Sequence, residues 1–306
     1  MAGMWLKAIT CFNLTQFPAL STEDLTAAVE AERFTPCSSM ERERHGFTPV
    51  YEQESLVRKV GDVFWMQLKS EVKPIPGAIV KRMLAERIKE IEQRDARKVA
   101  RKEKKELKEE IIDEMIATAL PVESYVTVMV DPKAKLLVIG TASAKRAERV
   151  LVQMMRCIDN LGFSRMEFAK TIPGQMSNLL LDEESSEFVT DSSLVLQGPG
   201  SPAATVRFAK HSLAGAEIVN HLNAGLRPIE LELGWQERLS FVLNERFEIK
   251  RLAFLDLVTS DFENAKPEDP GELIDAMLMI QNGELREMIV ALTAWLGGPA
   301  EKAATA

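Results

Sequence analysis

The sequence predicts an α+β protein in which a strand-rich body carries one long projecting helical arm. Two observations predict this fold. Residues 78–119 contain no glycine or proline and show helical apolar stripes only towards their two ends, whereas the segments on either side alternate apolar and polar residues as strands do. One continuous helix of that length would run about 63 Å, longer than a usual globular helix. We therefore expect an arm that projects from the body, either straight or bent.

Residues 1–76 are expected to form the N-terminal α+β part of the body. Alternation predicts a strand over residues 4–14, and a Ser-x-x-Asp start predicts a helix from residue 21 to about residue 33. Residues 57–69 resemble a hairpin that turns at a Gly-Asp pair. Two prolines and a glycine then break the chain before the arm.

The arm, residues 77–121, carries the strongest charge pattern. Residues 94–108 hold eight cations and three acids, a net charge of +5 in a chain whose net charge is −8. At 100° per residue, a continuous helix gathers the cations in one arc and leaves the acids outside it. Such a face predicts binding to a polyanion, because phosphates replace condensed counterions there. The cations are Arg94, Arg97, Lys98, Arg101, Lys102, Lys104, Lys105 and Lys108.

Residues 122–173 are expected to form a β-hairpin followed by a helix. Alternating apolar residues predict strands over 125–130 and 136–141 around an Asp-Pro turn. Ser143 is the predicted N-cap of a helix over residues 144–161.

The C-terminal half is predicted to contain an irregular segment and a second α+β part of the body. Residues 174–204 are rich in glycine, serine and proline and include an acidic run, which predicts irregular structure in solvent. Residues 205–306 predict a short strand, a helix, two or three further strands and a packed helix over 272–295 in an acidic tail.

Two smaller groups of cations accompany the arm. Lys145 and Arg146 stand at the start of a predicted helix, where cations oppose the helix dipole, and this placement favours an anionic ligand. Arg207 and Lys210 lie on a predicted strand and its exit. Surface solubility explains this second pair equally well.

Several function classes are excluded by composition. The three cysteines form no CxxC pair and the three histidines share no helical face, so no metal or other cofactor is expected. The chain has no secretory signal and no stretch near the roughly 18 apolar residues that span a bilayer, and we expect a cytoplasmic protein without membrane contact. Aromatic residues make up 6% of the chain, which favours contact with a duplex backbone over base stacking.

Two alternatives remain open. Asp62, Glu71 and Lys73 are the best candidates for a Mg²⁺-dependent nuclease, because such carboxylates hold Mg²⁺ and activate water. That site requires two adjacent strands, whereas this segment is predicted to form a turn, one strand and a loop. The other alternative is a scaffold whose charged arm binds an acidic protein partner.

Seven motifs together carry a family resemblance. They are MWLKAI at 4–9, FTPC at 34–37, KSEVKPIPG at 69–77, ARKVARKEKKELKEEI at 96–111, TASAKRAE at 141–148, WQERLSFVL at 235–243 and KRLAFLD at 250–256. With these motifs, the chain resembles the bacterial recombination-associated RdgC family over most of its length. The likeness is weakest at residues 174–204 and in the tail.

The resemblance implies a DNA-binding protein without catalytic activity, in which two subunits join at both ends into a homodimeric ring around duplex DNA. It further implies little sequence preference, association with the nucleoid, and restraint of the RecA recombinase by occupation of its DNA. Carried over residue by residue, the lining of the ring comprises Lys73, Arg97, Lys98, Arg101, Lys102, Lys145, Arg146 and Lys210.

One departure from the family concerns the end of the arm. The family commonly has a Leu-Pro-Arg-Ala-Phe run there, whereas this chain reads Ile-Ala-Thr-Ala-Leu through Leu120. An arginine and an aromatic residue are missing, so closure between two arms is expected to be built differently here.

Overall fold

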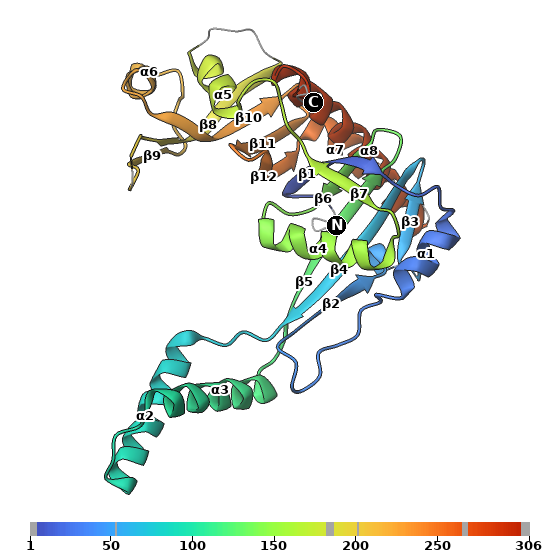
Figure 1. The fold of residues 1–306 in the computed structure, drawn as a ribbon. Helices are drawn as coiled ribbons and strands as arrows, with labels where there is room; N and C mark the ends of the chain where they lie inside the picture. Colours follow the sequence, from blue (N-terminus) through green and yellow to red (C-terminus); the bar gives the residue numbers. More distant parts are fainter. Residues whose placement is uncertain (1–4, 53, 182–186, 201, 265–268, 301–306) are drawn as a thin grey trace, which may run out of the picture.

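The computed structural model describes residues 5–52, 54–181, 187–200, 202–264 and 269–300. Over these residues the protein is α+β, as predicted, with a large antiparallel sheet flanked by helices (Figure 1). The N-terminal half comprises β1 (Ile9–Gln16), α1 (Thr22–Glu30), β2 (Glu43–Thr48), η1 (Val50–Glu52), β3 (Val57–Val60), β4 (Val63–Val72), α2 (Gly77–Asp95), α3 (Arg101–Thr118), β5 (Val122–Asp131), β6 (Leu136–Ile139) and α4 (Ala144–Cys157).

The C-terminal half adds a comparable set of strands and helices. They are β7 (Gly162–Arg165), α5 (Ile172–Leu180), β8 (Phe188–Gln197), β9 (Thr205–Phe208), α6 (Ala216–Asn223), β10 (Arg227–Trp235), β11 (Leu239–Asn244), β12 (Glu248–Phe254), α7 (Asp256–Asn264) and α8 (Pro270–Trp295). Over the described residues the sheet runs β2-β4-β5-β6-β1-β12-β11-β10-β8-β9, with β3 paired to β4 and β7 to β1.

Several predicted elements are present with shifted ends. Ser21 caps α1 as predicted, its hydroxyl accepting a hydrogen bond from the Asp24 amide at 3.1 Å. The hairpins β3–β4 and β5–β6 match the two predicted hairpins. The helix predicted over 144–161 ends already at Cys157, and Ser143 occupies its N-cap position without a side-chain hydrogen bond to the helix.

The segment predicted to be irregular, residues 174–204, is instead largely ordered. It contains most of α5 and the ten-residue strand β8, while residues 182–186 of the acidic run lie outside the described residues. β8 pairs with both β9 and β10. The pattern of this strand is weak because residues 190–193 in its first half are all polar, and pairing on both sides supplies the stabilisation that local sequence does not.

The arm is bent so sharply that α2 and α3 are two separate helices, and the continuous helix assumed for the arc of cations is wrong. The arm is inserted between β4 and β5, which pair along their whole length up to the last pair, Val72 with Val122. Its two ends therefore lie side by side, so a single 63 Å helix would pull these strands apart. The chain folds back at Ala96, which adopts the left-handed conformation with φ of 50°.

The sheet is covered on both faces, and alternate residues of the central strands serve the two cores. Trp65 and Met129 contribute to the core under α8. Their neighbours Met66 and Val128 contribute to the core under α1 and α4. Helix α8 contacts both halves of the sheet through ion pairs, which are Arg58–Asp275, Asp131–Arg286 and Arg238–Glu284.

The molecule has a crescent outline in Figure 1, with the arm at one end and β9 and α6 at the other. Both ends are insertions between neighbouring long strands: the arm between β4 and β5, and β9 with α6 between β8 and β10. β4 and β8 are seven steps apart in the antiparallel sheet and so run oppositely, but a twist of about 20–25° per step rotates them by roughly 140–175°. The twist thus brings both insertions to the same side.

Candidate nucleic-acid interface

Helix α3 presents an exposed cationic face. Within α3, Arg101, Lys104, Lys105 and Lys108 fall inside a 100° arc at 100° per residue, and all four are exposed. Lys105 lies 3.7 Å from Glu109, a long contact, while among the described residues Arg101, Lys104 and Lys108 have no ion pair. Their charges are therefore available to a ligand.

The packing of α3 explains why its cationic face points to solvent. Its buried residues, Ile111 and Ile116, and its partly buried Leu107 lie towards α2 or the body, and Arg87 of α2 reaches across to Glu114 with its Nη2 2.6 Å from the carboxylate. Lys102 stands at the margin of the face, 3.7 Å from Glu106. Glu106 and Glu109 thus pair with lysines of α3 itself and Glu114 pairs with α2. Among the described residues, Arg101, Lys104 and Lys108 remain free of ion pairs.

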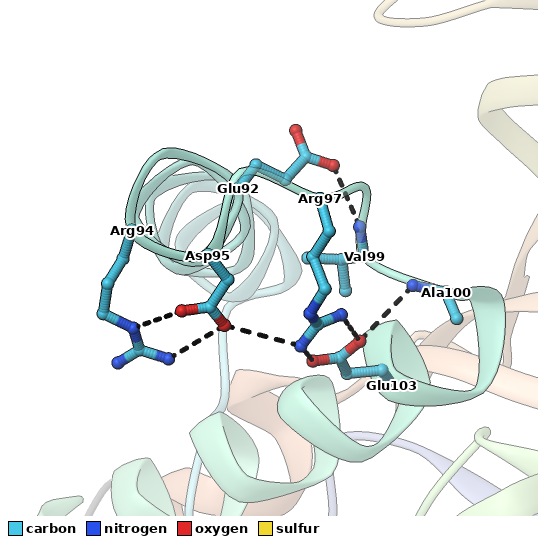
Figure 2. Close-up of polar contacts among 7 residues, drawn as sticks. All are labelled: Glu92, Arg94, Asp95, Arg97, Val99, Ala100 and Glu103. Atoms are coloured by element: carbon cyan, nitrogen blue, oxygen red, sulfur yellow. Dashed lines mark hydrogen bonds and ion pairs between the residues drawn. The ribbon is translucent and has the colours of Figure 1, made fainter.

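The predicted arc of eight cations is corrected at its N-terminal side. Arg94 belongs to α2, and Arg97 and Lys98 lie in the connection between the helices, so none of the three continues the α3 face. Figure 2 shows Arg94 bound to Asp95 and Arg97 bound to Glu103. Lys98 is exposed. The arc of eight cations was calculated for one continuous helix. Because the chain folds back at Ala96, that calculation does not hold for the three cations that precede α3.

These ion pairs shift the titration of both acids. The Arg97 guanidinium, through its hydrogen bonds, holds the pKa of the Glu103 carboxyl below its usual value. Arg94 does the same to the pKa of Asp95. Both acids are therefore charged at neutral pH, and the pairs persist there.

Lys73 is not an exposed lining residue, which corrects the expectation for this position. Its side chain is 4% exposed and its Nζ donates hydrogen bonds to the carbonyl oxygens of Ser38 at 2.8 Å and Ser39 at 2.9 Å. Lys73 holds the loop after α1 to the end of β4. Its ammonium group is therefore engaged by the protein's own carbonyls.

The carboxylates proposed for the nuclease alternative, Asp62 and Glu71, do not lie close enough to share a metal ion. Asp62 lies in the β3–β4 turn beside Lys133, and Glu71 lies near the other end of β4, where its carboxylate accepts a hydrogen bond from the Cys37 amide at 2.8 Å. The intervening length of β4 separates the two acids by about 30 Å. Across the described residues, no group of three His, Cys, Asp or Glu side chains is arranged to hold a metal ion.

The two smaller cationic groups are exposed, as a ligand would require. Lys145 and Arg146 stand in the first turn of α4, which lies between the two ends of the crescent (Figure 1). Arg207 on β9 and Lys210 just after it lie at the end opposite the arm.

Two further cations escaped the sequence analysis. Arg165 at the end of β7 and Arg246 in the β11–β12 turn are exposed, and both line a groove of about 1150 Å³ between α4 and that turn. Arg227, in the same groove, is paired with Glu245 at 3.0 Å. Arg165 and Arg246 are isolated in sequence, so no local charge run marks them.

Comparison with known proteins places the chain among relatives of the same length. A family model described as "Putative exonuclease, RdgC" matches residues 4–299. The chain belongs to the RdgC family. Its relatives include the recombination-associated proteins RdgC of Herminiimonas arsenicoxydans and Janthinobacterium sp. (strain Marseille), each 30% identical over 98% of this chain and 100% of the relative. That of Laribacter hongkongensis is 32% identical over 97% of this chain and 100% of the relative.

The resemblance predicted from the motifs is therefore confirmed. The two descriptions differ on activity, since the family model names an exonuclease and the relatives are named for recombination. No helix in the described part of this RdgC chain has the length and apolar character needed to cross a membrane.

Proposed function

We propose that this RdgC protein binds duplex DNA through its phosphates, without sequence preference and without cleaving it, in the service of recombination. The observation that carries the proposal is the exposed face of α3, where Arg101, Lys104 and Lys108 project from an otherwise acidic protein without carboxylate partners among the described residues. Phosphate contacts position a protein without reading sequence. The recombination-associated names of the relatives support DNA as the polyanion.

The binding unit is proposed to be a homodimer that closes around the duplex. Each crescent would supply the α3 face, Lys145 with Arg146, and Arg207 with Lys210 to one enclosed space. Exposed apolar side chains at the base of the arm support self-association: Leu120 is 83% exposed, Val122 59% and Tyr125 49%. The two helices of the arm, α2 and α3, leave this apolar patch uncovered. A second subunit of the same chain would cover it.

Restraint of a RecA-type recombinase follows from the same proposal, because a protein that occupies duplex DNA limits access to it. The expected location is the cytoplasm, on the nucleoid. The exonuclease description gains no support from Asp62 and Glu71, which lie at opposite ends of β4. We therefore propose DNA binding without a catalytic step.

A salt titration with and without Mg²⁺ tests the proposal. Fluorescence anisotropy with a random-sequence duplex is expected to give a slope of log K against log salt near −3.6 for each arm, if four α3 cations each contact one phosphate. A slope near zero would remove DNA binding. Shortening of a labelled duplex in Mg²⁺, lost in Glu71→Ala, would instead support the nuclease.

Circular and linear duplexes then separate ring closure from simple contact. A closed ring is expected to slide off a short linear duplex at high salt and to stay on a covalently closed circle. Equal release from the two forms would leave phosphate binding intact and refute enclosure. A duplex with both ends blocked by bound streptavidin serves as the matched control, since it should behave as the circle does.

A further inference from the structure

The elbow of the arm, residues 94–103, is closed by a chain of ion pairs (Figure 2). The two terminal nitrogens of Arg97 donate hydrogen bonds to the two oxygens of Glu103 at 2.7 and 2.6 Å. Asp95 lies 3.6 Å from Arg97 and accepts a hydrogen bond from Arg94 at 2.7 Å. The network joins the end of α2 to the first turn of α3.

The backbone of the elbow needs this support. Residues 96–100 read Ala-Arg-Lys-Val-Ala and contain no glycine, although Ala96 has φ of 50°, a conformation that costs a non-glycine residue roughly 1 kcal/mol or more. Alanine, arginine and lysine favour helix, so local propensity opposes the break. Side-chain contacts must hold the turn that the β4–β5 pairing demands.

Acidic side chains also satisfy the amides of the turn. The Val99 amide donates a hydrogen bond to Glu92 at 3.1 Å, and the Ala100 amide donates one to Glu103 at 3.4 Å. Val99 is 5% exposed and anchors the turn against the helices. Glu103 therefore serves both the Arg97 fork and the start of α3.

The guanidinium of Arg97 is consequently occupied by Glu103, unlike that of an arginine that is free to bind phosphate. Both terminal nitrogens of its guanidinium face Glu103, and that carboxylate is only 28% exposed. Turning Arg97 to a phosphate would leave Glu103 charged beside an anion. The face of α3 begins at Arg101, inside the elbow, so the direction of that face depends on the closed network.

We propose that Arg97 and Glu103 are positioning residues that set the angle of α3 against α2, and that Arg97 does not itself bind phosphate. The elbow part of this inference stands on contacts within the arm. Its consequence for DNA rests on the proposed function. A loosened elbow would misdirect the cations of α3 and weaken binding although no phosphate ligand has been removed.

The sharpest test is Glu103→Gln, because the two interpretations predict opposite signs. Removal of an acid next to a phosphate-binding face strengthens DNA binding if only charge matters. Under the positioning role, the variant weakens the elbow and lowers affinity, by about eightfold at 0.1 M salt for each phosphate that α3 no longer reaches. Glu106→Gln is the matched control, since it removes an exposed acid of α3 that pairs only with Lys102 among the described residues, and it should not weaken binding.

Arg97→Lys provides the second variant, because lysine keeps the charge but cannot form the two-pronged contact with a carboxylate. Weaker DNA binding is expected, whereas a direct phosphate contact would survive this change. Arg82→Lys, on the exposed surface of α2 beside Glu86, is its control and should leave affinity unchanged.

A distance measurement without DNA tests whether Arg97 and Glu103 hold the angle between α2 and α3. Spin labels at exposed Lys89 and Asp113, in a background without native cysteines, report the distance between α2 and α3. A narrow distribution is expected in the parent protein and a broader or longer one in Glu103→Gln and Arg97→Lys. Unchanged distances, or stronger DNA binding by Glu103→Gln, would overturn the positioning role. If the parent protein bound no DNA, the proposed function would fail while the distances still judged the elbow.

Discussion

Removing two cations from the centre of the α3 face should change the salt dependence of DNA binding by a defined amount. Lys104 and Lys108 are exposed, one turn apart, and free of ion pairs among the described residues. We consider the double variant Lys104→Gln and Lys108→Gln. Both side chains lie in solvent, so their replacement should leave the folded arm intact.

The magnitude follows from the number of phosphates contacted. Four cations on the face give a slope near −3.6 for each arm, and two give a slope near −1.8, at about −0.9 per contact. Between 50 and 200 mM salt the parent affinity should fall about 150-fold, and that of the variant only about 12-fold. At 0.1 M salt the variant should bind roughly 60-fold more weakly per arm.

Fluorescence anisotropy with a labelled random duplex measures these values at four or five salt concentrations. The control is Lys133→Gln with Lys135→Gln, which makes the same change in net charge on exposed lysines of the β5–β6 turn. That turn lies at the other end of β5, about 30 Å from the arm. Circular dichroism and thermal melting should show both double variants folded.

Equal losses of affinity in the two double variants would refute the interface, because net charge and not the α3 face would then govern binding. An unchanged slope in the Lys104 and Lys108 variant would do the same, since it would mean that neither lysine releases counterions on binding.

Three further predictions concern buried and paired groups. Lys73→Ala should lower the free energy of unfolding in urea by about 1–3 kcal/mol, because the carbonyls of Ser38 and Ser39 lose a buried donor. The affinity of this variant for DNA should stay within about twofold of the parent. A large loss of affinity without loss of stability would instead indicate that Lys73 contacts DNA. The elbow should respond to acid in one direction only: the pKa values of Glu103 and Asp95 are lowered by Arg97 and Arg94, so the closed form is stable above the ordinary carboxyl pKa and is lost as pH falls through the lower folded values. The distance between labels on α2 and α3 should be constant from pH 8 down to about 5 and lengthen only below about pH 4, and lengthening near pH 6 would contradict this assignment. Burial raises the pKa of the buried Cys11 and the half-buried Cys157 to about 12. At pH 8 Ellman's reagent should therefore modify Cys37 first in the native protein and all three thiols in urea. Rapid modification of Cys11 in the native protein would count against its buried placement.

The α+β class and most elements of the core were predictable because their signals are local. Alternation marks β4 and β5 through neighbours such as Trp65 and Met66, which point into different cores, and Ser21 marks the start of α1. The cationic face of α3 was predictable too, because Arg101 to Lys108 fit inside one helix. The family resemblance followed from short motifs in the same way.

Only the tertiary structure decided where the helix of the arm breaks and what its first cations contact. Nothing in Ala-Arg-Lys-Val-Ala signals a turn, yet the pairing of Val72 with Val122 forces one. That turn brings Arg97 into an ion pair with Glu103, so Arg97 does not belong to the cationic face of α3. Lys73 is a similar case, since loop carbonyls brought from Ser38 and Ser39 bury a lysine that sequence reasoning left exposed.

The sequence by itself determined the charge periodicity, the amphipathic strands and the family, because each is carried by residues within a few positions of one another. The tertiary structure decided the crescent, since sheet twist accumulates over strands that are distant in the chain. It also decided which cations stay free, because a side chain's partner depends on which segments the β4–β5 and β8–β10 pairings bring together.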